Sequence, residues 1–171
     1  QEGLAADLYD ATQAVLEGRG FAAYEVSNHA RTDAARSRHN LVYWRGQDYA
    51  GVGPGAHGRL TLAGVREATV APDRPADYIA AVGEGRLARE PLTPVEAAEE
   101  RLLSGLRVSE GVGFGEVAGL GLAPDHPTVR RMVGLGLVAD DARRLRATPA
   151  GRRVLDRLTS ELATASPLPR A

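Results

Sequence analysis

The chain is organised around residues 24–59, which read Y-E-V-S-N-H-A-R-T-D-A-A-R-S-R-H-N-L-V-Y-W-R-G-Q-D-Y-A-G-V-G-P-G-A-H-G-R. This stretch holds three of the four histidines, which are His29, His39 and His57. It also holds the single tryptophan, Trp44, and three of the five tyrosines. Aromatic residues make up only 5% of the chain, so this clustering indicates a site rather than an evenly distributed core.

The segment before this stretch predicts a helix followed by a strand. Residues 4–16 carry apolar side chains at helical spacing, and Gly18 and Gly20 end the helix. The apolar residues 21–26 then read as a short strand. A helix–turn–strand unit is typical of α/β proteins and predicts a parallel sheet or barrel. Residues 27–38 are polar and read as a loop after the strand, where α/β proteins usually place their sites.

A glycine-rich segment, residues 51–58, closes the stretch and contains four glycines. Residues 49–52 read as a second short strand that leads into it. Glycine lacks a Cβ atom and permits positive φ, so the backbone can pass close to a ligand. A tight strand-to-strand turn without a ligand explains the pattern equally well. Residues 59–70 then predict a hairpin around Ala63 and Gly64.

A domain boundary is expected at residues 83–91, after a short helix over residues 77–82. We therefore expect one domain at residues 1–88 and a second at residues 89–171. The second begins with Thr93-Pro94-Val95-Glu96, which predicts a capping box and a helix to about Arg107. Three leucines of this helix are expected to face the core: Leu102, Leu103 and Leu106.

The rest of the second domain has the element order of a winged helix. Asp125 is expected to cap a helix, and residues 137–139 and 144–147 read as the two strands of a wing. Residues 149–162 predict a last helix with Val154 on its apolar face. These signals indicate a small winged-helix-like α+β domain.

Winged helices often bind DNA, and this end of the chain is rich in arginine. However, Asp140 and Asp141 occupy the expected wing tip and repel phosphate. The formal net charge of the chain is only −1. We therefore expect no nucleic-acid partner, and a solvated basic face explains the arginines: Arg130, Arg131, Arg143, Arg144, Arg146, Arg152, Arg153 and Arg157.

Composition excludes several kinds of site. The chain contains no cysteine, so it cannot by itself form disulfides, zinc–thiolate sites or cysteine-ligated iron–sulfur clusters. No run of eighteen apolar residues exists, so no transmembrane segment is expected, and we expect a cytoplasmic protein. The single methionine is Met132, so we expect the sequence to be a piece of a longer protein.

His39 begins the aromatic block. A neutral imidazole is a common metal and heme-iron ligand, and Tyr43 and Trp44 have faces that fit a flat macrocycle. The alternative is a histidine that hydrogen-bonds a neighbouring loop beside core aromatics. His57 fits either a ligand site or a turn cap. Glu25 fits either a general base or an ion pair with a nearby arginine, and the ion pair is preferred.

Three segments of the chain resemble one known family. Residues 24–28, 38–45 and 51–58 are similar to the C-terminal half of HemW, a heme chaperone of the radical S-adenosylmethionine (SAM) family. That family is related to oxygen-independent coproporphyrinogen III oxidase. The motif His-Asn-x-x-Tyr-Trp followed by Gly-x-Gly-Pro-Gly-Ala-His-Gly is long and ordered, and the resemblance covers essentially the whole chain.

The resemblance implies an α/β fold, in which the C-terminal part of an incomplete (β/α) barrel precedes the winged-helix-like domain. It implies heme as a ligand, with His39 on the iron, and SAM on the side of the glycine loop. No catalytic residue is expected in this chain. The cofactor-binding residues that the resemblance implies are His39, Asn40, Tyr43, Trp44, Gly53, Gly55 and His57.

The family holds its [4Fe–4S] cluster with a three-cysteine motif near its N-terminus, and this chain has no such motif. The resemblance therefore implies a heme-binding fragment of a heme chaperone, with heme-acceptor proteins and an upstream barrel half as partners. Without that half, residues 1–89 are expected to expose apolar faces. The alternatives are an oxygen-independent coproporphyrinogen III oxidase of porphyrin biosynthesis and a winged-helix nucleic-acid-binding or interaction module.

Overall fold

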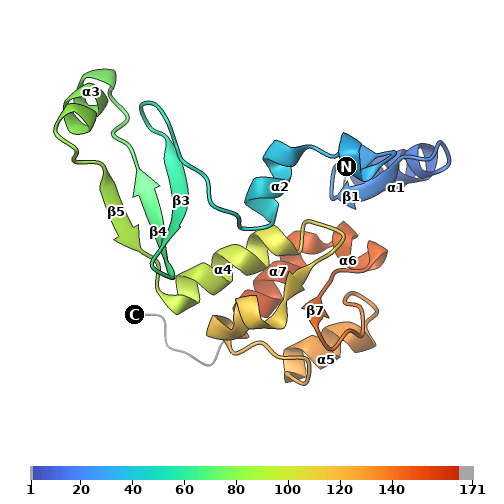
Figure 1. Cartoon of the computed structure of the whole chain (residues 1–171). Coiled ribbons are helices and arrows are strands. Elements are labelled where there is room, and N and C mark those ends of the chain that lie inside the picture. Colours follow the sequence, from blue (N-terminus) through green and yellow to red (C-terminus); the bar gives the residue numbers. More distant parts are fainter. Residues whose placement is uncertain (1, 166–171) are drawn as a thin grey trace.

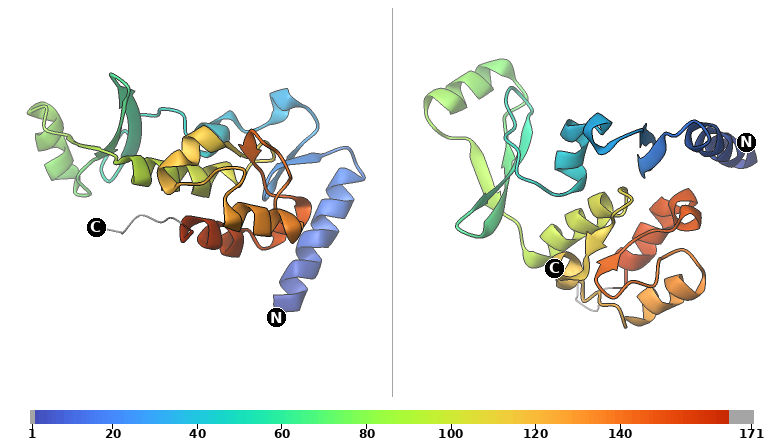
Figure 2. Two further views of the ribbon diagram at one scale, coloured as in Figure 1. Left: turned by 90° about the horizontal axis from the view of Figure 1, so that it is seen from below. Right: turned by 45° about the vertical axis from the view of Figure 1, so that its right-hand side comes forward.

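The structure is a computed structural model that describes residues 2–165. Its helices and strands, with η for 3-10 helices, follow one another in this order: α1 (Glu2–Glu17), β1 (Ala22–Glu25), β2 (Asn28–Ala30), η1 (Asp33–Ala35), α2 (Arg38–Trp44), β3 (His57–Leu62), β4 (Val65–Val70), α3 (Pro75–Gly83), β5 (Ala88–Pro91), α4 (Pro94–Gly105), β6 (Val112–Gly113), η2 (Phe114–Leu120), α5 (Pro127–Gly134), β7 (Arg144–Leu145), α6 (Pro149–Arg153) and α7 (Leu155–Ala163). Helices α1 and α3 lie at opposite ends of the molecule, and the C-terminal helices gather between them (Figures 1 and 2).

The predicted helix and strand at the start of the chain form as α1 and β1, but their sheet differs from the expectation. Strand β1 pairs antiparallel with β2, which lies inside the segment predicted to be a loop. The chain reverses direction between β1 and β2 in a turn that Glu25 stabilises. The Glu25 carboxylate accepts hydrogen bonds from Ser27 and Asn28 in this turn. The strand pairs among the described residues are antiparallel, so the parallel pairing suggested by the helix–strand unit does not occur between these strands.

The aromatic block forms helix α2. The Ser37 side chain caps it by accepting a hydrogen bond from the backbone N–H of Asn40. Leu41 is buried in a small cluster with Tyr24, Ala30 and Val108. Because residues four apart share a helix face, α2 places His39 and Tyr43 side by side.

The predicted hairpin at residues 59–70 is confirmed as β3 and β4. Its turn holds Ala63 and Gly64, both at positive φ, and β5 extends the sheet antiparallel to β4. The second strand predicted at residues 49–52 is wrong, because pairing there is limited to one bridge between Tyr49 and Arg59.

Helix α4 anchors the C-terminal core. Its capping box is confirmed, since Thr93 and Glu96 exchange side-chain and backbone hydrogen bonds. Leu102 and Leu106 are fully buried, but Leu103 is 59% exposed, so its predicted core position is wrong. Adjacent helical residues point about 100° apart, which turns Leu103 away from the core. The core also contains Val112, Val117, Leu120, Leu122, Val129, Met132, Val138, Leu145, Leu155, Leu158 and Leu162.

Several local predictions in the C-terminal region need correction. The cap of α5 is His126 rather than Asp125, because the His126 imidazole accepts from the backbone N–H of Thr128. Strand β7 pairs with β6, and the expected wing strands meet through the single bridge Val138–Ala147. The last helix breaks at Val154, which leaves the helical conformation and is exposed.

Large apolar side chains are exposed mainly on the elements before α4. Helix α1 exposes Leu4, Leu8 and Val15, although their spacing follows the predicted apolar face. The others in this region are Tyr43, Val52, Leu62, Val65, Val70, Ile79, Val82 and Leu87. Among the described residues, no helix is both long and apolar enough to cross a membrane.

Candidate functional site

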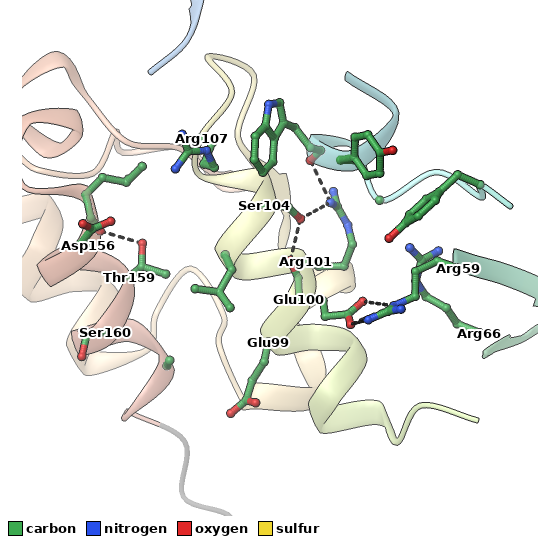
Figure 3. Close-up of a pocket in the computed structure, with 17 residues that line it drawn as sticks. Arg59, Arg66, Glu99, Glu100, Arg101, Ser104, Arg107, Asp156, Thr159 and Ser160 are labelled. Atoms are coloured by element: carbon green, nitrogen blue, oxygen red, sulfur yellow. Dashed lines mark hydrogen bonds and ion pairs between the residues drawn. The ribbon is translucent and has the colours of Figure 1, made fainter. Parts of the chain in front are cut away.

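A pocket lies where α2 and the β3–β4 hairpin meet α4 and α7 (Figure 3). Its cavity volume of about 710 Å³ falls within the range of small-molecule and cofactor sites. The wall contains three aromatic residues and four arginines, which come from segments far apart in sequence. Its lining residues are Tyr43, Trp44, Gly46, Tyr49, Arg59, Arg66, Glu99, Glu100, Arg101, Leu103, Ser104, Arg107, Leu155, Asp156, Thr159, Ser160 and Ala163.

Helix α2 supplies the aromatic wall. The rings of His39 and Tyr43 meet edge to face with centroids 4.9 Å apart, and Tyr43 meets Tyr49 in the same way at 4.6 Å. The Tyr43 hydroxyl lies 3.3 Å from His39 Nε2, and the Asn40 side-chain oxygen lies 3.4 Å from His39 Nδ1. His39 is exposed. Its imidazole therefore reaches solvent at the rim of the aromatic wall.

Two pocket arginines are saturated by protein acceptors. Arg59 binds Glu100 through Nε and Nη2 and donates from Nη1 to the backbone of Gly58. Arg101 binds Glu116 and donates from Nη1 to the backbone oxygen of Trp44. Its Nη1 also donates to Ser104, as Figure 3 shows. Both arginines serve chiefly to hold the pocket elements together.

Arg107 connects the pocket to a buried carboxylate. Its guanidinium carbon lies 4.6 Å above the centre of the Trp44 ring, and its Nη2 lies 2.9 Å from the carboxylate of Glu25, which is 1% exposed. The predicted ion pair of Glu25 is confirmed, but its partner lies 82 residues away rather than nearby in sequence. Burial acts to raise the pKa of Glu25, but hydrogen bonds from Asn28, Ser27 and Arg107 outweigh it, so this pKa lies below its usual value.

Backbone packing explains why two positions of the glycine-rich segment, residues 51–58, hold glycine. A Cβ atom at Gly51 would collide with the backbone of His57, and one at Gly58 would come within 2.9 Å of the Gly51 nitrogen. Gly53 and Gly55 both adopt positive φ. A Cβ at Gly55 would meet the Asp73 carboxylate, whereas Gly53 faces open space.

The structure brings together only part of the predicted site. Tyr43 and Trp44 line the pocket, and His39 contacts Tyr43 beside it. Asn40 adjoins His39, whereas the remaining predicted residues are outside the pocket wall: Gly53, Gly55 and His57. Sequence reasoning missed the contribution of α4 and α7, which carry most of the polar lining. The local signals there, a capping box and helical periodicity, concern folding alone.

The residues present fit heme better than an iron–sulfur cluster. Histidine is a common ligand of heme iron, and an accessible imidazole beside flat aromatic surfaces is offered by His39, Tyr43 and Trp44. Trp44 Nε1 is buried and has no hydrogen-bond partner within residues 2–165. A cysteine-ligated cluster does not fit, because the sequence lacks cysteine. No grouping of His, Asp and Glu that could hold a metal ion occurs in the described part of the chain.

Several arginines of the basic C-terminal face pair with carboxylates. Arg130 pairs with Asp140, and Arg153 pairs with Asp10 of α1. Glu161 binds both Arg131 and Arg157. The guanidinium of Arg144 donates to the backbone oxygens of Glu110 and Gly111. These contacts favour the interpretation of a solvated, internally paired face.

Comparison with known proteins identifies relatives of this chain. Residues 92–154 match the family model of the HemN C-terminal domain. The bovine (Bos taurus) mitochondrial radical S-adenosyl methionine domain-containing protein 1 is 38% identical over 93% of this chain and 39% of its own length. The heme chaperone HemW of Bacillus subtilis is 35% identical over 72% of this chain and 33% of its own length.

Coproporphyrinogen III oxidase (HemN) from Escherichia coli, a radical SAM enzyme, has the same fold, with a TM-score of 0.59 at 18% identity. The match covers 92% of this chain and 40% of the enzyme. The chain thus spans about two fifths or less of these relatives' lengths. The expected mixed α/β fold is confirmed by this match. The chain belongs to the HemW- and HemN-like radical SAM family, of which it carries the C-terminal portion with the HemN C-terminal domain.

Proposed function

We propose that this chain is the heme-binding part of a heme chaperone that delivers heme to acceptor proteins. The observation that carries the proposal is the exposed imidazole of His39 beside the aromatic wall of the pocket. The likeness to relatives named heme chaperone HemW supports the same assignment. Bound heme would supply an iron centre that accepts an imidazole nitrogen, and His39 would provide that nitrogen.

His39 is the residue proposed to hold the iron. It lies in the first turn of α2, and its ring meets the edge of Tyr43 one turn later. A neutral imidazole binds iron through one ring nitrogen while the other donates a hydrogen bond, which fixes the ring orientation. Asn40 Oδ1 lies next to Nδ1 and is the acceptor proposed for that bond. Nε2 would then bind the iron, which displaces the Tyr43 hydroxyl that lies 3.3 Å from it. Tyr43 and Trp44 then present apolar ring surface to the macrocycle.

The remaining roles are assigned to the two proposed domains, residues 1–88 and 89–171. Residues 51–58 are proposed to face the SAM side of the barrel, with Gly53, Gly55 and His57 lining it. The open space at Gly53 is compatible with such an approach. The second domain is proposed to be winged-helix-like, since its strands β6 and β7 and the Val138–Ala147 bridge lie among the helical segments α4, η2, α5, α6 and α7.

A hemin titration tests the proposal on this chain. The Soret absorbance is followed for the unmodified chain, for His39→Ala and for His57→Ala as a control at another exposed histidine. We expect saturable binding near one equivalent, a weakened or spectrally altered complex in His39→Ala, and an unchanged complex in His57→Ala. Binding unaffected by His39→Ala removes His39 from the iron. Absence of specific binding contradicts heme binding by this chain.

A further inference from the structure

We infer that Arg107 is the specificity-determining residue of the pocket, where its guanidinium receives a carboxylate group of a flat anionic ligand. The inference rests on the proposed function and deepens it, since heme carries carboxylates at one edge. The carboxylate edge of the heme would then lie on the side of the pocket where the Arg107 guanidinium stacks over the Trp44 ring.

The first argument is the number of donors that remain available. Arg107 donates from Nη2 to Glu25, and its Nε is buried without an acceptor in the described part of the chain. Its Nη1 has no acceptor within residues 2–165, and this is the donor that remains for a ligand. Its side chain keeps 32% exposure at the pocket wall. By contrast, every nitrogen of the Arg59 and Arg101 guanidiniums already has an acceptor. A planar guanidinium with unused donors is suited to binding a carboxylate.

The second argument is that Arg107 is held in place before any ligand arrives. Its backbone oxygen accepts from Val26, and Ser109 donates to Tyr24, so two hydrogen bonds fix the chain on either side of Val108. Its head group is fixed by the buried carboxylate of Glu25 and by stacking on Trp44. A group fixed in this way loses little conformational entropy when it binds.

The third argument is the charge around the pocket. The carboxylates of Glu99 and Asp156 also line it and repel a ligand carboxylate. Arg66 is the rival, because its Nε is buried without a partner and its Nη1 lies 3.3 Å from Asp48. Arg66 lacks the aromatic stacking partner that Arg107 has on Trp44, so Arg107 is preferred.

The test compares hemin with its dimethyl ester, which has the same ring and iron but no free carboxylate. The double variant Glu25→Gln/Arg107→Gln removes the free donors without leaving a buried unpaired charge. The matched control, Arg45→Gln/Glu110→Gln, removes an ion pair whose two residues do not line the pocket. Urea unfolding verifies that both double variants fold, and the single variant Arg66→Gln tests the rival.

We expect the unmodified chain and the Arg45/Glu110 control to prefer hemin over the ester by about 10- to 100-fold. The Glu25/Arg107 variant is expected to lose this preference while keeping the Soret maximum set by His39. Equal binding of hemin and ester by the unmodified chain overturns the inference but leaves the heme proposal standing. Loss of the preference in Arg66→Gln, with retention in the Glu25/Arg107 variant, also overturns it. No Soret change with either compound overturns both proposals.

Discussion

The substitution Glu25→Gln is expected to destabilise this protein more than any comparable change at its surface ion pairs. Oε2 of Glu25 accepts three hydrogen bonds from Ser27 and Asn28, and Oε1 accepts one from Arg107. Glutamine has the same shape but one acceptor oxygen. Whichever way its amide turns, the NH2 group faces a donor, and a buried polar contact becomes repulsive.

The magnitude follows from the burial of the two partners. Removing one partner of a buried ion pair costs about 3–5 kcal/mol. Here Glu25 is buried, but 32% of the Arg107 side chain is exposed and can be hydrated after the pair is broken. We therefore expect a cost at or just below the lower end of this range, about 2–3 kcal/mol in the free energy of unfolding. The control is Glu100→Gln, whose partner Arg59 and own side chain are both partly exposed, with an expected cost below about 1 kcal/mol.

Urea unfolding as a function of pH separates charge from shape. The pKa of Glu25 is lowered in the folded protein, so the stability contributed by its charge is present above the unfolded pKa. It is lost as the pH falls through the folded pKa, below about 4.3, the ordinary value for glutamate. The difference between the unmodified chain and Glu25→Gln should therefore shrink with acidification. A difference that stays constant down to low pH, or a cost no larger than that of Glu100→Gln, would show that the charge of Glu25 does not stabilise the fold.

Two further predictions concern the C-terminal core and its packing. Leu102→Ala should lower the free energy of unfolding by about 2–5 kcal/mol, because Leu102 is fully buried. Leu103→Ala, at the neighbouring exposed position, should change it by less than about 1 kcal/mol. Equal losses of stability in urea unfolding would contradict the different burial of the two leucines. Gly151→Ala should cost about 1–3 kcal/mol because its Cβ would collide with the backbone oxygen of Leu137. The exposed Gly134, with nothing near its Cβ position, provides the control Gly134→Ala, and equal effects of the two variants would argue against the close packing.

Local signals in the sequence predicted local structure well. The capping box at Thr93 and the hairpin turn at Gly64 are encoded by residues within four positions of one another, and both are confirmed. The break at Val154 was missed, because the apolar spacing continues through it. Helix α2 was also missed, since its aromatic residues favour strands and its Ser37 cap lies in a polar segment.

The glycine loop shows why a motif alone did not distinguish a ligand cradle from a turn. Both interpretations require glycine, and the sequence does not reveal which atoms approach the missing Cβ. In the structure, the backbone of His57 occupies that position at Gly51. The packing therefore explains Gly51 and Gly58 without a ligand, whereas the role of Gly53 depends on what approaches its open side.

The pocket depends on contacts that no local pattern encodes. The matched HemN C-terminal domain, residues 92–154, contains Arg107 but lacks its partners Glu25 and Trp44. The α7 wall at Asp156 and Thr159 lies beyond the other end of that match. Since Arg107 joins a buried carboxylate from one segment to an aromatic ring from another, the same ion pair supports folding and shapes the pocket. A change that breaks it should therefore alter stability and ligand preference together, whereas a change at His39, which is exposed, should alter ligation with little effect on stability.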